Sequence, residues 1–166
     1  MVKLKNKTPT DFKKILDRVY RFLSLRPRSK KEVADYLKNR KISPFEGEKI
    51  FKILKEQKLI NDLEFAKWWV EQRETFKPKG KIALRVELKQ KGISEEIIEK
   101  ALVHIDEESL AKKALAKKIE AYRKLPLEEF FRKISQFLSY RGFSWQTIEK
   151  IILEGKVAKK FKNDKI

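Results

Sequence analysis

A short pattern occurs three times in this sequence at nearly equal intervals. In each copy a leucine stands six positions before a serine, and an apolar residue directly precedes that serine. The intervals between the serines are 51 and 50 residues, and the three are Ser43, Ser94 and Ser144. A repeat of this length indicates a row of similar units, each too small for a large core, that pack against their neighbours.

Each copy of the pattern is typical of one helix ending and another beginning. Gly92 and Gly142 can adopt the left-handed conformation that closes a helix without a Cβ penalty. Ser94 and Ser144 then stand where a side-chain oxygen accepts hydrogen bonds from the first turn of the next helix. The first copy has Lys41 in place of glycine. We therefore expect a differently shaped or slightly strained junction there.

Apolar residues recur at helical spacing along the chain, and no segment shows the alternation of a β-strand. The predicted fold is all-α: three tandem three-helix repeats, resembling helix-turn-helix units, in an elongated, curved modular array. In the third repeat we expect one long first helix from Asp106 to Tyr122. The predicted divisions are a basic N-terminal arm (1–8), repeat 1 (9–58), repeat 2 (59–105), repeat 3 (106–155) and a frayed basic tail (156–166).

The sequence lacks the features of secreted and membrane proteins. It has no cysteine, so disulfides and thiolate metal sites are excluded. The N-terminal segment is basic but has no apolar core like that of a signal peptide. No apolar run approaches the roughly 20 residues of a membrane span. We expect a cytoplasmic monomer without membrane association.

The chain carries a large positive charge. It has 42 Lys and Arg against 24 Asp and Glu, a net charge of +18. Residues 1–60 have 18 basic and 7 acidic side chains, net +11; residues 61–105 have 9 and 8, net +1; residues 106–166 have 15 and 9, net +6. A surplus of this size indicates a polyanionic partner such as nucleic acid. The nearly neutral middle favours a role in packing or in contacting protein.

Residues for catalysis are scarce. The single histidine, His104, precedes Asp106 near a helix end, where complementing the helix dipole explains both residues. The acidic pairs at 95–96 and 128–129 fall in first helical turns, where carboxylates stabilise helices. No glycine-rich phosphate loop is present. The sequence therefore predicts a binding protein rather than an enzyme, with no catalytic residue, metal site or cofactor.

Candidate contact residues lie on or beside the middle helix of each predicted repeat. Most aromatic residues occupy core stripes, but Trp145 follows a capping serine and is a candidate for stacking on a base. Any single basic residue is commonly just solvated, whereas recurrence on equivalent helices favours a shared face. The candidates for contact with a partner or DNA are Arg28, Lys30, Lys31, Lys38, Arg85, Lys89, Arg132, Arg141 and Trp145.

Several segments together resemble the RecX family, regulators of the bacterial recombinase RecA, over about residues 12–155. Their order and spacing carry the resemblance, whereas each segment alone is weak. The segments are LSLRPRSKKEVADYL (23–37), LINDLEFA (59–66), GKIALRVELKQKGI (80–93) and FLSYRGFS (137–144).

This resemblance implies three tandem three-helix units and a protein that lies along the groove of the RecA filament on single-stranded DNA. It implies inhibition of filament growth, ATPase, strand exchange and coprotease activity. Binding of double-stranded DNA stays open, because the positive charge is large enough for direct DNA contacts. The alternative is a RecA-independent DNA-binding module of helix-turn-helix type, which would usually be a symmetric dimer.

Overall fold

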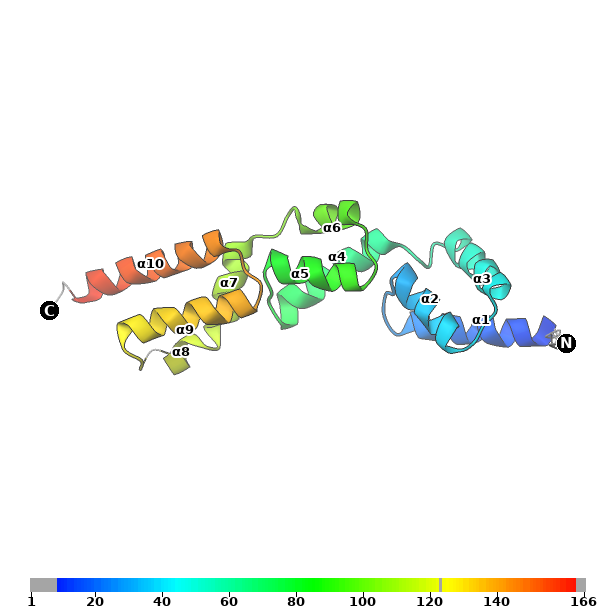
Figure 1. Ribbon diagram of the computed structural model, residues 1–166, viewed down its shortest axis with the longest axis horizontal. Coiled ribbons are helices and arrows are strands. Elements are labelled where there is room, and N and C mark those ends of the chain that lie inside the picture. The colour runs from blue at the N-terminus through cyan, green and yellow to red at the C-terminus, as the bar shows by residue number, and fades with distance from the viewer. Residues whose placement is uncertain (1–8, 123, 164–166) are drawn as a thin grey trace.

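The computed structural model describes residues 9–122 and 124–163. These residues form ten α-helices and no strand. The helices lie in three groups along an elongated molecule, with the two ends of the chain at opposite ends of the row (Figure 1). The all-α prediction is confirmed. The basic arm expected at residues 1–8 lies outside the described residues.

Unit 1 has its own hydrophobic core. Its helices are α1 (Pro9–Ser24), α2 (Lys30–Asn39) and α3 (Pro44–Glu56). Apolar residues at helical spacing on all three helices meet in one cluster. The buried members are Ile15, Val19, Val33, Leu37, Ile50, Leu54 and Ile60.

Units 2 and 3 share a single core. Unit 2 comprises α4 (Asp62–Phe76), α5 (Lys81–Gln90) and α6 (Glu95–Leu102), and unit 3 comprises α7 (Glu107–Ala116), α8 (Ile119–Tyr122), α9 (Leu127–Tyr140) and α10 (Trp145–Asn163). One apolar cluster runs from Phe65 in α4 to Ile151 in α10. The described part of the molecule therefore has two hydrophobic cores, one in unit 1 and one shared by units 2 and 3.

Serine side chains cap three of the helices. Ser29 and Ser43 each form a capping box with the glutamate three residues later. Ser144 accepts a hydrogen bond from the Thr147 amide at 3.3 Å. Ser94 was predicted to do the same but makes no such bond. Its side chain is exposed, so water can satisfy the first-turn amides there, and two glutamates complement the dipole of α6.

The first junction has the same backbone shape as the other two. Lys41 has φ 55°, and Gly92 and Gly142 have φ 76° and 75°. Of the two expected alternatives, a different shape or slight strain, the strained junction is therefore the one present. A side chain in the left-handed region costs roughly 1 kcal/mol because Cβ approaches the backbone.

We predict that Lys41→Gly stabilises unit 1. Glycine adopts φ 55° without a Cβ penalty, although it also gains freedom in the unfolded chain, so the net gain should be about 0.5 to 1 kcal/mol. Chemical denaturation monitored by circular dichroism measures it. The matched control is Lys38→Gly within α2, where glycine should cost about 1 kcal/mol. A destabilising Lys41→Gly would contradict the assignment of strain.

Unit 3 departs from the predicted three helices. The long helix expected from Asp106 to Tyr122 is interrupted between α7 and α8. Leu115 is buried but Ile119, one turn later, is 37% exposed. The interruption moves Ile119 out of the apolar stripe and lets Tyr122 pack on the core instead.

The last helix is longer than expected. α10 continues through Asn163, so Gly155 does not begin a frayed tail. A Cβ at Gly155 would come within 3.1 Å of Cε1 of Phe131. The glycine therefore permits close packing of α10 on α9 rather than ending the helix.

Candidate nucleic-acid and partner interface

A buried polar joint connects unit 1 to unit 2. The hydroxyl of Ser29, which is fully buried, donates to the carbonyl of Lys91 at 2.7 Å. The amide of Lys30 donates to Oδ1 of Asp62 at 2.8 Å. The start of α2 is thereby held against the turn between α5 and α6 and against the first residue of α4. We call this contact joint 1–2.

The same construction recurs between units 2 and 3. The amide of Gly80 donates to the carbonyl of Arg141 at 3.0 Å, and that of Ile82 donates to the carbonyl of Gly142 at 3.1 Å. The amide of Lys81 donates to Oε1 of Glu107 at 2.8 Å. We call this contact joint 2–3. In both joints the start of a middle helix binds the next unit's turn and the carboxylate at the start of its first helix.

Glu32 concentrates charge at joint 1–2. Its carboxylate accepts hydrogen bonds from Arg26 in unit 1 and Lys91 in unit 2, both at 2.8 Å. Burial favours the neutral acid, but these bonds outweigh burial and lower the pKa of Glu32 to about 2. The Arg26 guanidinium also lies 5.5 Å from the Trp68 ring centroid in unit 2. Glu32 therefore stays ionised and bridges the two units.

Glu87 is a similar ionised acceptor inside unit 2. It accepts hydrogen bonds from the Trp69 indole and from Arg73, both at 2.8 Å, and from Lys79. Burial opposes ionisation, but these donors lower the pKa of Glu87. The cations around Glu87 are thus bound within the fold.

Five of the predicted contact residues pair with carboxylates. Lys30 lies 3.6 Å from Asp62, and Lys31 lies 2.7 Å from Asp35. The other pairs are Arg85 with Glu95 and Glu99, Lys89 with Glu95, and Arg132 with Glu129. These bonds raise the pKa of Arg85 and lower that of Glu95. A phosphate would have to compete with these carboxylates.

The remaining four predicted residues differ in environment. The Arg28 guanidinium lies 4.0 Å from the Phe22 ring centroid, and burial together with Arg26 lowers its pKa. Arg141 lies 5.0 Å from the Phe137 ring and donates to the carbonyl of Pro78. Lys38 is exposed, and Trp145 is 67% exposed. The shared contact face across the three units stays a prediction.

Unit 1 also carries a group of cations that are not among the predicted contact residues. In the part of the chain that the structure describes, these exposed residues form no ion pair. They belong to α1, to the α2–α3 turn, to α3 and to the turn after it, and none lies within a middle helix. The residues are Lys13, Lys14, Arg18, Arg21, Arg40, Lys41, Lys52, Lys55 and Lys58. The net charge of +11 was the signal that pointed to this unit.

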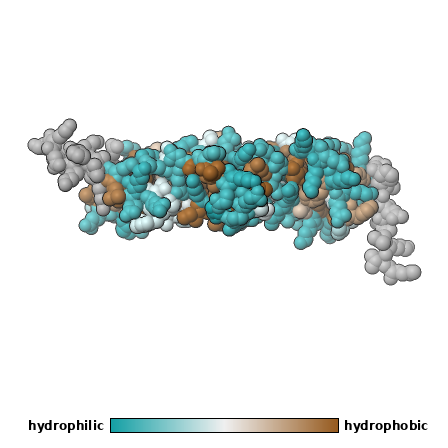
Figure 2. All heavy atoms as spheres, turned by 90° about the horizontal axis from the view of Figure 1, so that it is seen from above, coloured by the Kyte–Doolittle hydropathy of each residue, from teal (hydrophilic) through white to brown (hydrophobic). Residues whose placement is uncertain are grey.

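Unit 2 also exposes apolar side chains, as unit 1 does at Leu25 and Phe45. Ile82 and Val86 on α5 are 56% and 50% exposed, and Val103 after α6 is 63% exposed. Val103 also lines a hollow of about 490 Å³ beside Arg85. The face of the molecule seen in Figure 2 is largely hydrophilic, with separate apolar patches. A nearly neutral unit with exposed aliphatic residues suits contact with protein better than with phosphates.

Among the described residues, no group of three or more His, Asp or Glu side chains could hold a metal ion. None of the described helices has the length and apolar character to cross a membrane.

Models of three protein domains match this chain in order. They are described as the first, second and third three-helix domains of RecX, and they match residues 16–49, 61–102 and 106–152. Each match falls on one of the three units.

Known proteins show the same relationship. Regulatory protein RecX of Prosthecochloris aestuarii is 34% identical over 87% of this chain and 95% of its own length. That of Chlorobium phaeobacteroides is 37% identical over 86% and 94%. The Streptococcus uberis protein is 34% identical over 78% of this chain and 51% of its own length. The chain thus spans about half the length of several of the curated relatives it matches.

Solved structures agree with the sequence comparison. The crystal structure of RecX from Lactobacillus salivarius aligns with a TM-score of 0.78 at 27% identity, covering 90% of this chain and 99% of that one. A second crystal structure, of regulatory protein RecX, aligns with a TM-score of 0.74 at 31% identity, covering 84% and 72%. With three RecX domains matched in order and a relative aligned over nearly its full length, this chain belongs to the RecX family of regulatory proteins.

Proposed function

We propose that this chain is a negative regulator of the RecA recombinase. It lies along the RecA filament on single-stranded DNA and inhibits filament growth, ATPase, strand exchange and coprotease activity. Regulation of DNA repair and recombination follows. Membership of the RecX family supports this proposal.

The observation that carries the proposal is the division of surface chemistry along a row of jointed units. Among the described residues, unit 1 carries cations that form no ion pair, whereas unit 2 is nearly neutral and exposes Ile82, Val86 and Val103. An elongated molecule of this kind suits a filament, which offers phosphate along DNA and protein beside it (Figure 1). Weak contacts at several units reinforce one another because the joints hold the units at fixed spacing.

The direct test combines two assays. The first measures the ATPase activity of RecA on single-stranded DNA with substoichiometric amounts of this protein, and the second measures DNA binding without RecA. We expect suppression of the ATPase and only moderate, sequence-independent DNA binding. Tight binding to one duplex sequence, with no effect on the ATPase, would favour the helix-turn-helix alternative.

Salt dependence measures the electrostatic part of DNA binding. If about six phosphates are neutralised on single-stranded DNA, log K should fall with log salt at a slope of roughly −4. Fluorescence anisotropy of a labelled oligonucleotide at several salt concentrations gives the slope. A slope near zero would rule out phosphate contacts as the source of affinity.

A further inference from the structure

Four flat groups are stacked on one side of unit 1. The Phe22 and Tyr36 rings are stacked with centroids 4.2 Å apart. The Arg28 guanidinium lies 4.0 Å from the centroid of Phe22, and that of Arg40 lies 4.5 Å from the centroid of Tyr36. Because the two rings cover one face of each other, the guanidinium groups must lie on the outer faces. The order is therefore Arg28, Phe22, Tyr36, Arg40.

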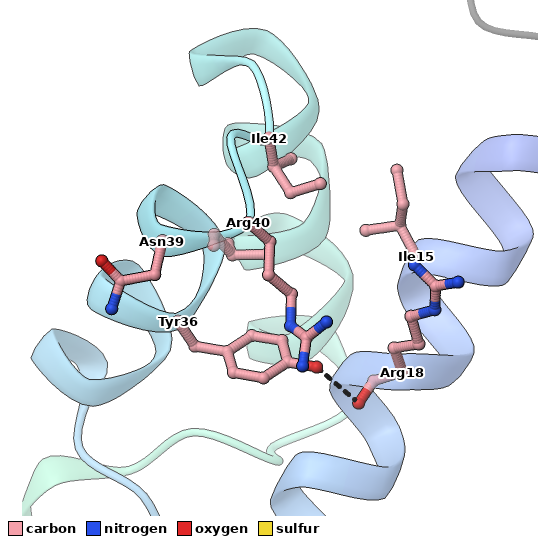
Figure 3. A pocket seen from close by; sticks show the side chains of 7 residues that line it. Ile15, Arg18, Tyr36, Asn39, Arg40 and Ile42 are labelled. Atoms are coloured by element: carbon pink, nitrogen blue, oxygen red, sulfur yellow. Dashed lines mark hydrogen bonds between the residues drawn. The ribbon is translucent and has the colours of Figure 1, made fainter.

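A cavity of about 310 Å³ adjoins the Arg40 end of this stack. Its walls come from α1, from α2 and from the turn after α2, and combine aliphatic, aromatic and cationic side chains. In Figure 3, Arg40 lies over the Tyr36 ring, while Ile15 and Arg18 face them from α1. The residues lining the cavity are Ile15, Arg18, Tyr36, Leu37, Asn39, Arg40 and Ile42.

In unit 2 the equivalent position is filled by the protein itself. The residues 51 positions after Arg18, Tyr36 and Arg40 are Trp69, Glu87 and Lys91. The Trp69 indole lies against this site, since it donates to Glu87 at 2.8 Å and lies 5.0 Å from Nζ of Lys91.

Unit 3 completes the comparison. Phe137 and Arg141, 50 residues after Glu87 and Lys91, stack at 5.0 Å. In unit 1, by contrast, the position of the Trp69 indole belongs to Arg18, whose side chain is exposed. Unit 1 thus has an aromatic wall and a cation, and the site stays open as a cavity among the residues that the structure describes.

The charges beside the cavity are cationic and unpaired. Arg18 and Arg40 form no ion pair within the described part of the chain. Tyr36 donates to the backbone carbonyl of Arg18 at 3.4 Å, so this hydrogen bond does not involve the Arg18 guanidinium. Lys14 and Arg21, one turn on either side of Arg18, extend the same face of α1. Asp17 lies three residues after Lys14 and four before Arg21, so it borders this face and offsets part of its positive charge.

We propose that this cavity binds one nucleotide of single-stranded DNA. The base stacks on the outer face of the Arg40 guanidinium, which the Tyr36 ring supports from behind, and contacts Ile15 and Ile42. The flanking phosphates bind Arg18 and the cations that continue along α1. This inference rests on the proposed engagement of DNA-bound RecA. Guanidinium groups stack on bases and also bind phosphates, so one wall serves both parts of a nucleotide. An acidic peptide would use the charges but not the flat stack.

The test compares Arg40→Ala with Lys52→Ala, a matched loss of one exposed unit 1 cation away from the cavity. Fluorescence anisotropy measures binding of a labelled oligothymidine and of an abasic oligonucleotide of equal length, without RecA. Arg40→Ala should weaken oligothymidine binding about tenfold, since stacking of one base is worth about 1 to 3 kcal/mol. It should also reduce the preference for oligothymidine over the abasic strand. Lys52→Ala should lower both affinities equally and by less than about threefold.

Two more variants protect the test from loss of structure. Tyr36→Phe keeps the ring and should retain the base preference, whereas Tyr36→Leu should lose it; circular dichroism checks that both are folded. Equal effects of Arg40→Ala and Lys52→Ala on both oligonucleotides would overturn the site. So would tighter, Arg40-dependent binding of a glutamate-rich peptide. The RecA ATPase assay tests the proposed function separately, because a protein without this site can still inhibit RecA.

Discussion

Replacing Gly80 by alanine is expected to lower the free energy of unfolding by about 3 kcal/mol. A Cβ at this position would overlap the carbonyl oxygen of Gly142 and the Cα of Phe143. Both are backbone atoms that no side-chain rotation can move. The start of α5 would have to move away from the turn before α10. Three hydrogen bonds of joint 2–3, each worth about 1 kcal/mol, would then be lost or lengthened.

The matched control for Gly80→Ala is Gly47→Ala in α3. A Cβ at Gly47 would meet only Cδ1 of Leu37, at an ordinary 3.9 Å. Alanine also favours a helix interior over glycine by about 0.5 to 1 kcal/mol, so this variant should be more stable. Urea denaturation compares the two. Equal stability of Gly80→Ala and the original protein would show that joint 2–3 tolerates a wider separation than its hydrogen bonds suggest.

Removing the charge of Glu32 is expected to weaken joint 1–2 by about 2 kcal/mol at pH 7. Glu32→Gln keeps the size of the side chain but leaves Arg26 and Lys91 close together without a carboxylate. A tenfold change in an ionisation constant is worth about 1.4 kcal/mol. A pKa lowered from 4.5 to about 2 would give about 3 kcal/mol, and partial exposure reduces this value.

The pH dependence of that loss has a definite sign. Because folding lowers the pKa of Glu32, its stabilisation is complete above pH 4.5 and disappears as the pH falls toward 2. The difference in stability between the original protein and Glu32→Gln should therefore shrink over this range, as measured by thermal unfolding. Asp35→Asn is the control, because it removes an exposed charge from the same helix. A difference that persists at pH 2 would show that the loss does not come from ionisation.

Local features of this fold could be predicted from the sequence, but the joints could not. The repeated junction, the capping boxes and the core stripes depend on residues within one turn or one loop of each other. Ser29, by contrast, is hydrogen-bonded to Lys91, 62 residues away. In the sequence, Gly80 simply follows the basic residues Lys77 and Lys79. Only its packing against the backbone of Gly142 shows that a side chain would not fit there.

The candidate site was harder to predict for the same reason. Charge counts identified the basic first unit, but not which cations are paired. Arg85 lies ten residues before Glu95, on a different helix, and only the packing of α5 on α6 brings the two together. The cavity of unit 1 exists because Arg18 stands where unit 2 has Trp69, whose indole fills the equivalent space. Such a cavity cannot be predicted from the pattern of residue types alone.

The claim that the joined row of units inhibits RecA is tested most directly by titrating RecA's ATPase on single-stranded DNA with the original protein, Glu32→Gln and Asp35→Asn. Unit 1 and the body of units 2 and 3 have separate cores, so Glu32→Gln should loosen joint 1–2 while each part stays folded. Both variants gain the same net positive charge, so weaker attraction to DNA cannot explain a difference between them.

We expect the original protein and Asp35→Asn to suppress the ATPase at similar substoichiometric concentrations. Glu32→Gln should require about tenfold more protein, because loosening the joint removes the advantage of linked contacts. Small-angle X-ray scattering establishes that the joint has loosened. An original protein that leaves the ATPase unchanged, or a loosened Glu32→Gln variant that inhibits equally well, would contradict the claim.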